Sequence, residues 1–234
     1  MHHKMKNKLN YVIRYTMRIR KKKWAQPELD VCRYFVKDPK RYFGKWKEFF
    51  NNDNEIQLEV GCGKCSFVAQ KALQNPDINF IAVDIKSDML GVGRRNIEKL
   101  FADNNKEVTN IALVAFNVEN INELISKDDN ISTMYINFCN PWPKDKHKKR
   151  RLTHTTKLNK YREFLTEDAI IKFKTDNDEL FDESFEYFDE SKFEIIYKTY
   201  DLHNSDVTDN IMTEHELMFS SEGIKIKHLI AKKL

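Results

Sequence analysis

The most informative stretch of this chain lies between Tyr135 and Leu152 and reads YINFCNPWPKDKHKKRRL. An apolar run stops at Asn140, and two prolines then force an extended backbone that ends the strand. Six cations and one acid follow within eight residues, which gives a local charge of +5. A rigid turn beside such a cationic run is suited to binding a polyanion over a pocket. The alternative is a strand-ending turn that leads into the solvated face of a helix.

A second chemical pattern places Gly61 and Gly63 directly after an apolar strand. Glycines at such a turn let backbone N–H groups approach a ligand closely, although no Gly-Lys-Ser/Thr follows, so a phosphate-binding P-loop is excluded. Asp84 lies about twenty residues further on, where an acid could bind ribose hydroxyls of a dinucleotide or a nucleoside. Glu59 would repel a diphosphate but would attract a ligand that carries an amino group and a sulfonium. The alternatives are a buried structural acid for Glu59 and a turn cap for Asp84.

Polar residues that could bind a ligand also occur at three further places in the sequence. Asn117 comes after an apolar run, where its amide could read an adenine edge, or it could be an ordinary loop residue. Asp176 ends another run and could equally cap the next helix. The segment 213–216 reads TEHE, and Thr-x-x-Glu is also the pattern of a helix capping box.

The cysteines do not predict a metal site. Cys62 and Cys65 form a CxxC at the start of a helix pattern, where thiolates are favoured. A zinc site would need a second ligand pair, but Cys32 and Cys139 are isolated and no His-x₃₋₅-His element accompanies them. We therefore expect no metal, and we expect reduced thiols in the cytoplasm.

The apolar pattern alternates between short strands and amphipathic helices from residue 55 to residue 176. Strands are predicted at 56–61, 80–84, 110–116, 133–138, 169–174, 193–199 and 225–230, and helices at 64–73, 87–101, 118–125, 155–165 and 177–188. This alternation predicts an α/β fold with a mostly parallel sheet, helices on both faces and an antiparallel last strand. Such sheets bind ligands beyond the carboxyl ends of their strands. The residues there are Gly61, Asp84, Asn117, Asn140 and Asp176.

The charge distribution also indicates a polyanionic partner. The chain of 234 residues has a net charge of +4, but residues 1–23 carry +9 without any acid. With the +5 of residues 144–151, this leaves −10 on the rest of the chain. Two basic segments on an acidic body point most simply to nucleic acid. A membrane surface is the other candidate, but neither segment has a clean apolar face and no apolar run is long enough to span a bilayer.

These residues together resemble the bacterial tRNA (guanine-N7-)-methyltransferase family. The matching pieces are the block MRIRKKKWA from Met17, LEVGCGK, AVDIK, INFCNPWPK with KHKKRR, FKTDN, and TEHELMFSSEG. The resemblance implies a Rossmann-like class I methyltransferase fold with a seven-stranded sheet and S-adenosylmethionine as the methyl donor. It implies that the acceptor is N7 of a guanosine in the tRNA variable loop, at tRNA position 46.

The resemblance also assigns site residues by position. It makes cofactor-site residues of Glu59, Gly61, Gly63, Asp84, Asn117 and Asn140. It makes substrate-site residues of Lys144, Asp176, Thr213, Glu214, His215 and Glu216. It assigns RNA contacts to Lys146, His147, Lys148, Lys149, Arg150 and Arg151, and catalytic roles to Asn140, Asp176 and Glu216.

This chain departs from the family pattern at four of these positions. Family members commonly have Asp where this chain has Asn140, Gly at Cys65, Glu at Asp84 and Tyr at His215. Members usually begin near Met17, so we expect residues 1–16 to be an extension or a misplaced start. Residues 17–54 are then a basic arm with a helical lead-in, and residues 55–234 a single methyltransferase domain, active as a monomer or a homodimer.

Guanine N7 already carries a lone pair, and a sulfonium is a good leaving group. The main task of such an enzyme is alignment, which can contribute roughly 7–11 kcal/mol. We expect Asp176 and Glu216 to accept hydrogen bonds from the guanine edge while Lys144 binds a phosphate. Three alternatives stay open at this point: a methyltransferase with another acceptor such as rRNA or protein, a non-catalytic tRNA-binding protein, and an NAD-linked oxidoreductase.

Overall fold

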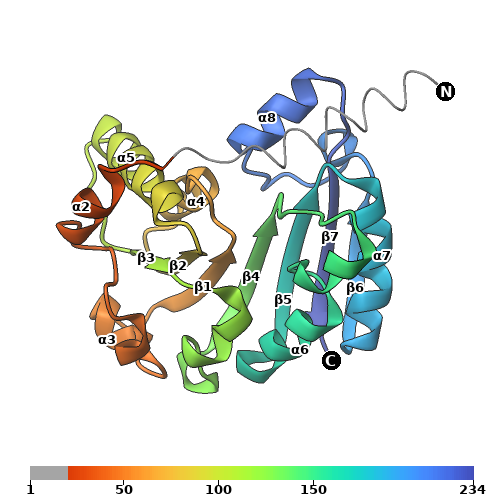
Figure 1. Cartoon of the computed structure of the whole chain (residues 1–234), viewed down its shortest axis with the longest axis horizontal. Helices are drawn as coiled ribbons and strands as arrows, with labels where there is room; N and C mark the ends of the chain where they lie inside the picture. Colours follow the sequence, from red (N-terminus) through yellow and green to blue (C-terminus); the bar gives the residue numbers. More distant parts are fainter. Residues whose placement is uncertain (1–20) are drawn as a thin grey trace.

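The computed structural model describes residues 21–234. The predicted extension 1–16 and residues 17–20 of the basic arm, which include the proposed start at Met17, lie outside these residues. Seven strands form one sheet, in the order β3-β2-β1-β4-β5-β7-β6 (Figure 1). The strands are β1 (Glu55–Val60), β2 (Ile78–Asp84), β3 (Ile111–Ala115), β4 (Ile131–Asn137), β5 (Leu165–Thr175), β6 (Phe193–Thr199) and β7 (Lys227–Lys233).

The strand directions match the predicted sheet. β1 pairs in parallel with both β2 and β4, and the parallel pairing continues to β3 on one side and β5 on the other. β7 is antiparallel to both of its neighbours, β5 and β6. The expectation of a mostly parallel seven-stranded sheet with an antiparallel last strand is therefore confirmed. Because the order reverses between β1 and β4, the chain leaves an opening beyond their carboxyl ends.

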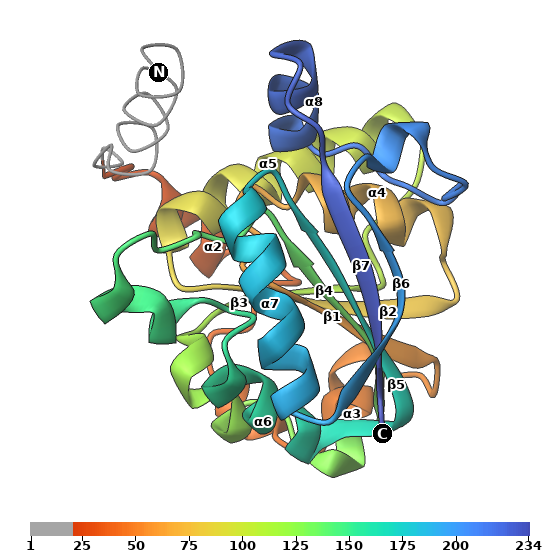
Figure 2. The same cartoon turned by 90° about the vertical axis from the view of Figure 1, so that its right-hand side faces the viewer.

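Helices cover both faces of this sheet (Figure 2). The α-helices are α2 (Ala25–Asp30), α3 (Trp46–Phe50), α4 (Ser66–Gln74), α5 (Ser87–Asp103), α6 (Thr155–Phe164), α7 (Asp178–Glu190) and α8 (Glu214–Ser221). Short 3-10 helices are η1 (Pro39–Tyr42), η2 (Val118–Glu123), η3 (Lys127–Asp129), η4 (Asp145–Arg150) and η5 (Leu202–Asn204). The helix predicted at 118–125 is thus a 3-10 helix.

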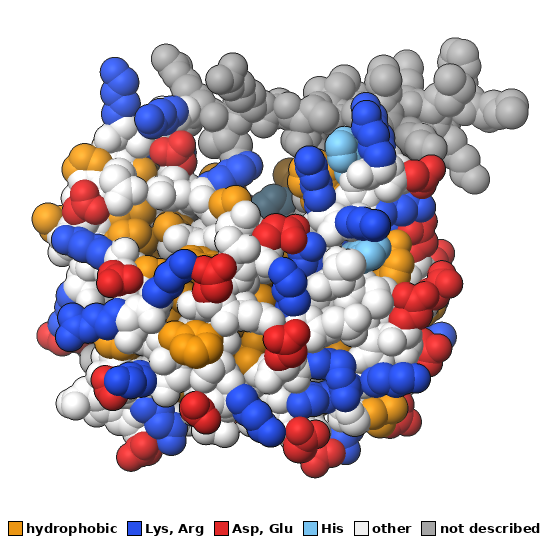
Figure 3. Space-filling model, turned by 60° about the horizontal axis from the view of Figure 1, so that its bottom comes forward, with side chains coloured by type: hydrophobic (Ala, Val, Ile, Leu, Met, Phe, Trp, Pro, Cys, Tyr) orange, Lys and Arg blue, Asp and Glu red, His pale blue; other side chains and the backbone are white. Residues whose placement is uncertain are grey.

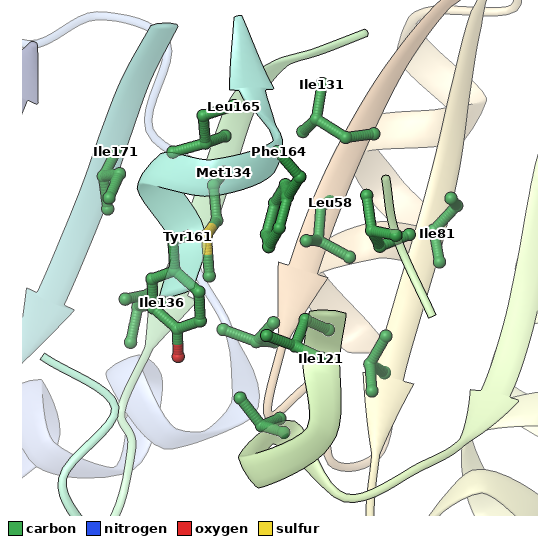
Figure 4. Packing of buried hydrophobic residues seen from close by; sticks show 14 of the residues in the cluster. Leu58, Ile81, Ile121, Ile131, Met134, Ile136, Tyr161, Phe164, Leu165 and Ile171 are labelled. Atoms are coloured by element: carbon green, nitrogen blue, oxygen red, sulfur yellow. The ribbon is translucent and has the colours of Figure 1, made fainter. Parts of the chain in front are cut away.

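Two apolar cores result, one on each face of the sheet. On β2, Phe80 and Ala82 belong to the core under α2, α4 and α5, whereas Ile81 and Val83 belong to the opposite core. This alternation is what the period of two in a strand requires when both faces are covered. In the second core, Leu58 and its neighbours pack against Phe164 and Tyr161 of α6 and against η2 (Figure 4).

The surface outside these cores carries mixed charges. Lys and Arg alternate with Asp and Glu over the face seen in Figure 3, instead of gathering into one continuous patch. Among residues 21–234, no helix is both long enough and apolar enough to cross a membrane.

The buried side chain of Leu58 offers a test of this packing. Leu58 has no exposed surface in the central strand β1. We expect Leu58→Ala to lower the free energy of unfolding by roughly 2–5 kcal/mol, because it removes buried methyl groups and leaves a cavity. Urea denaturation measures this loss. Ile196→Ala, at a side chain that is 51% exposed, is the matched control; a similar loss in both variants would contradict the described core.

Candidate active site

The glycine loop after β1 is bound to the carboxyl end of β2. Gly61 and Gly63 have φ angles of +74° and +53°, which favour glycine. The N–H groups of Gly61 and Cys62 donate to the carbonyl of Val83 at 2.8 and 3.1 Å. A Cβ atom at position 61 would lie 3.2 Å from the side chain of Leu152, so the loop also passes close to the segment after the basic run.

Glu59 is the carboxylate that faces the ligand side of this loop. It is 3% exposed, and its Oε1 atom accepts a hydrogen bond from Asn137 Nδ2 at 3.0 Å. Its Oε2 atom is buried and has no hydrogen-bond partner within the described part of the chain. Burial raises the pKa of Glu59 to about 8, although the bond from Asn137 and the charge of Lys174 oppose the shift. A buried carboxylate oxygen in this state would be stabilised by a cationic ligand group.

A hollow in the surface joins Glu59 to a distant part of the chain. Its lining residues are Glu59, Gly61, Cys62, Gly63, Lys64, Ser66, Phe67, Asn137, Phe138, Thr213, Glu214 and His215. The structure therefore brings together the glycine loop and the TEHE segment, as expected for two halves of one site. Sequence reasoning missed Asn137 and Phe138; a polar Asn near the end of an otherwise apolar strand was the available signal.

Asp84 supports the glycine loop from outside this hollow. Its Oδ2 atom accepts from the N–H of Gly63 at 3.0 Å, and its Oδ1 atom accepts from the N–H of Lys86 at 2.8 Å. Burial raises the pKa of Asp84 in spite of these two bonds, which favour the ionised form. The turn-cap alternative is thus realised, and it ties the acid directly to the loop.

Asn117 also has a local structural role, because its side chain caps the 3-10 helix η2. It is exposed, and its Oδ1 atom accepts from the N–H of Glu119 at 3.0 Å, which caps η2. It does not line the hollow around Glu59. Its contact with a cofactor therefore stays a prediction.

Asn140 shapes the turn between β4 and the basic run. Its Oδ1 atom accepts from the N–H of Trp142 at 3.1 Å, so the side chain forms a local turn. Phe138 and Trp142 on either side have φ angles of +51° and +42°. Such backbone conformations are rare for residues with a Cβ and cluster at functional sites. Lys144 follows this turn and is exposed.

The basic run divides into exposed and internally bound cations. Lys146, Lys149 and Arg150 are exposed, and the Arg150 guanidinium lies 5.0 Å from the centre of the Trp142 ring. His147 is half-buried, with its ring edge against the same Trp142. Lys148 instead donates to Glu183 at 2.7 Å and lies 3.0 Å from Asp145, so neighbouring acids balance its charge.

Arg151 corrects the predicted set of RNA contacts. Its side chain has no exposed surface, so it does not face a polyanion. Its guanidinium donates to Glu183 at 2.6 Å, to Glu179 at 3.3 Å and to the carbonyl of Pro141 at 2.6 Å. A buried guanidinium needs such partners, because an unpaired buried charge is very costly.

The TEHE segment lies opposite the glycine loop at the start of α8. Thr213 caps this helix by accepting from the N–H of Glu216 at 3.1 Å, as the capping-box alternative allowed. Glu214 is exposed and forms an ion pair with Lys64 at 2.7 Å. His215 stacks on Phe138 with ring centres 6.2 Å apart and an angle of 17° between the planes.

Glu216 does not face the hollow, which corrects the expectation that it binds guanine directly. The residue has no exposed surface. Its Oε2 atom accepts from Lys174 at 2.7 Å, and its Oε1 atom bonds to His203 at 2.8 Å and to Asn210 at 2.6 Å. Although burial opposes the shift, the charge and hydrogen bond of Lys174 lower the pKa of Glu216. Its role in this structure is to fix the start of α8.

Asp176 lies buried after β5, with 5% of its surface exposed. Its carbonyl oxygen accepts from Lys227 Nζ at 3.0 Å, which links the end of β5 to β7. It does not line the hollow around Glu59. Its contact with guanine stays a prediction.

The cysteines are free thiols in the structure. All four are buried, and the Sγ atoms of Cys62 and Cys65 lie 3.7 Å apart. Within residues 21–234, no group of three or more His, Cys, Asp or Glu side chains is arranged to hold a metal ion.

The pKa of Glu59 predicts how the stability of the chain depends on pH. Glu59 ionises near 4.5 when unfolded but keeps its proton to about pH 8 when folded. Between these values the folded state binds the extra proton, so the free energy of unfolding should fall as pH rises. Glu59→Gln should remove this fall, which is on the order of a few kcal/mol. Urea denaturation of both proteins across this pH range measures the difference; parallel curves would contradict the shifted pKa.

Comparison with known proteins identifies the family. A family model described as "Putative methyltransferase" matches residues 53–229. A tRNA (guanine-N(7)-)-methyltransferase of Clostridium beijerinckii is 59% identical over 217 residues, which cover 93% of this chain and 99% of that protein. One of Clostridium perfringens strain 13 is 55% identical over 219 residues, covering 93% of this chain and all of that protein.

Solved structures show the same fold at low sequence identity. A 16S rRNA (adenine(1408)-N(1))-methyltransferase variant with cosubstrate SAM, from Catenulisporales acidiphilia, has a TM-score of 0.59 and 14% identity. The match covers 85% of this chain and 92% of that one. The 16S rRNA methyltransferase KamB has a TM-score of 0.58 and 11% identity over 81% of this chain and 92% of its own. With its fold, its glycine loop and these relatives, the chain belongs to the tRNA (guanine-N(7)-)-methyltransferase family of class I methyltransferases.

Proposed function

We propose that this chain transfers the methyl group of S-adenosylmethionine to N7 of a guanosine in the variable loop of tRNA. The observation that carries this proposal is the Oε2 atom of Glu59, buried without a hydrogen-bond partner among the described residues. Glu59 is one of the residues that line the hollow beside the glycine loop. A carboxylate there suits a cofactor with an amino group and a sulfonium, and it disfavours the diphosphate of NAD.

The residues around the hollow fit this cofactor. Glu59 would bind the amino group, and the backbone of Gly61 and Gly63 would lie close to the bound nucleoside. Asp84 keeps the loop in place through the N–H of Gly63. When bound, S-adenosylmethionine supplies an activated methyl group on a good leaving group. Proton transfer is not needed to start the reaction, because guanine N7 has its own lone pair.

The exposed cations of the basic run support the acceptor side of this proposal. Lys144, Lys146, Lys149 and Arg150 are exposed and would bind tRNA phosphates, which carry most of the affinity for a nucleic acid. Asp176 would accept from the guanine edge, and His215, stacked on Phe138, lies at the mouth of the cofactor hollow. Glu216 acts through α8, whose first turn it fixes, and not through contact with the base.

Methyl transfer to an unmodified tRNA transcript tests the proposal directly. With tritiated S-adenosylmethionine, we expect label in the transcript, and chemical cleavage at N7-methylguanine should map it to the variable loop. A transcript with that guanosine replaced by adenosine is the control and should take up no label. Label at another base, or no label together with no binding of S-adenosylhomocysteine, would contradict the proposal.

Asn140 leads to a second prediction about the rate. Positive charge moves onto the purine as the methyl group is transferred, and a carboxylate near it would be favourable. Asn140→Asp keeps the oxygen that accepts from the N–H of Trp142, so the turn should persist. We expect the single-turnover rate at saturating tRNA to rise by about tenfold. An unchanged rate would show that position 140 does not face the developing charge.

A further inference from the structure

We propose that Arg151 is a positioning residue that fixes the turn from Asn140 to Lys144, and that it is not a contact to RNA. The inference rests on the proposed function, because it concerns how the same turn is presented to tRNA. One observation supports it: Asn140, which precedes the basic run, and Arg151, which ends it, bind the two polar atoms of one peptide group.

The peptide group between Pro141 and Trp142 is bound at both of its polar atoms. Its carbonyl oxygen accepts from Arg151 Nε at 2.6 Å, and its N–H donates to Asn140 Oδ1 at 3.1 Å. A peptide group is planar and rigid, so fixing its carbonyl also fixes the direction of its N–H. The orientation of the Asn140 side chain is therefore coupled to the position of the Arg151 guanidinium.

This turn needs an external support because its backbone is strained. Trp142 has a φ angle of +42°, which costs free energy for a residue with a Cβ. Such a conformation persists only when surrounding contacts determine it. The hydrogen bond from Arg151 to Pro141 is a buried contact of this kind, made from ten residues further along the chain.

Arg151 is itself anchored to α7. Its other two nitrogens donate to Glu183 at 2.6 Å and to Glu179 at 3.3 Å. Although burial opposes the shift, the hydrogen bond from Lys148 and the charge of Arg151 lower the pKa of Glu183, which stays ionised. Two residues on, Thr153 bonds to Ser184 of the same helix at 2.8 Å, and both are fully buried. The end of the basic run is thus packed against α7.

Arg150 and Arg151 form a natural pair for the experiment. They are adjacent and carry the same charge, but Arg150 is exposed and Arg151 is buried. The dependence of tRNA affinity on salt separates their roles, because each lost phosphate contact lowers the slope of log affinity against log salt by about one. The slope reports the number of phosphate contacts, whereas the single-turnover rate at saturating tRNA reports how the bound guanosine is positioned.

The variants are made in the full-length chain, with the unmodified tRNA transcript as the ligand. Arg150→Ala should weaken tRNA binding and lower the salt slope by about one. Arg151→Gln should leave the slope unchanged but lower the single-turnover rate at saturating tRNA by about 10- to 100-fold, because a neutral amide cannot hold three acceptors in one plane. Arg33→Gln, the same substitution at an arginine that is 62% exposed, should change neither quantity.

Glu183→Gln supplies the independent test, because Glu183 does not touch the turn. It decides the matter if Arg151→Gln fails to fold. The anchoring role predicts a lower rate with an unchanged slope. A surface that only binds RNA predicts tighter tRNA binding and an unchanged rate, since an acid is removed beside Lys148. That result, or a slope lowered by about one in Arg151→Gln, would overturn the proposal. If the unaltered chain methylates no tRNA, the proposed function fails instead, and the salt slopes still report on Arg151.

Discussion

The buried hydrogen bond from Asn137 to Glu59 lies where the strand order reverses, and the cofactor side of the site depends on it. β1 and β4 are neighbours in the sheet although two strands separate them in the chain. Their following loops diverge, so the space beyond Glu59 stays open. Asn137 satisfies one carboxylate oxygen and leaves the other for a ligand. Asn137 and the charge of Lys174 offset part of the free energy cost of ionising this buried acid, and a bound cationic group would offset more of it.

A second buried interaction positions the other half of the site. Lys174 and Glu216 pair at 2.7 Å with almost no exposed surface. Such pairs contribute little net stability, because desolvation cancels most of the attraction. Their consequence here is geometric: the pair joins β5 to the first turn of α8. That turn carries Glu214 and His215 to the glycine loop, where Glu214 meets Lys64.

The sequence predicted the sheet and the glycine loop well, because both depend on local patterns. Apolar runs of strand length alternate with helices, and Gly61 and Gly63 are needed by the backbone itself. The roles of Glu216 and Arg151 were not predictable in this way. Whether a charged side chain is buried depends on partners from distant segments, and these were Lys174 and His203 for Glu216 and Glu183 for Arg151.

The local geometry explains why two adjacent arginines differ so much. Arg150 ends the 3-10 helix η4, whereas Arg151 follows it with an extended backbone at φ −61° and ψ 137°. This change of conformation turns the second side chain inward, toward the acids of α7. The cations at 148 and 151 are therefore balanced by Glu179 and Glu183. Two acidic residues of α7, Glu179 and Glu183, thus hold the end of the basic run in place. Because these cations balance their charges, the two acids do not repel the polyanion that the basic run is suited to bind.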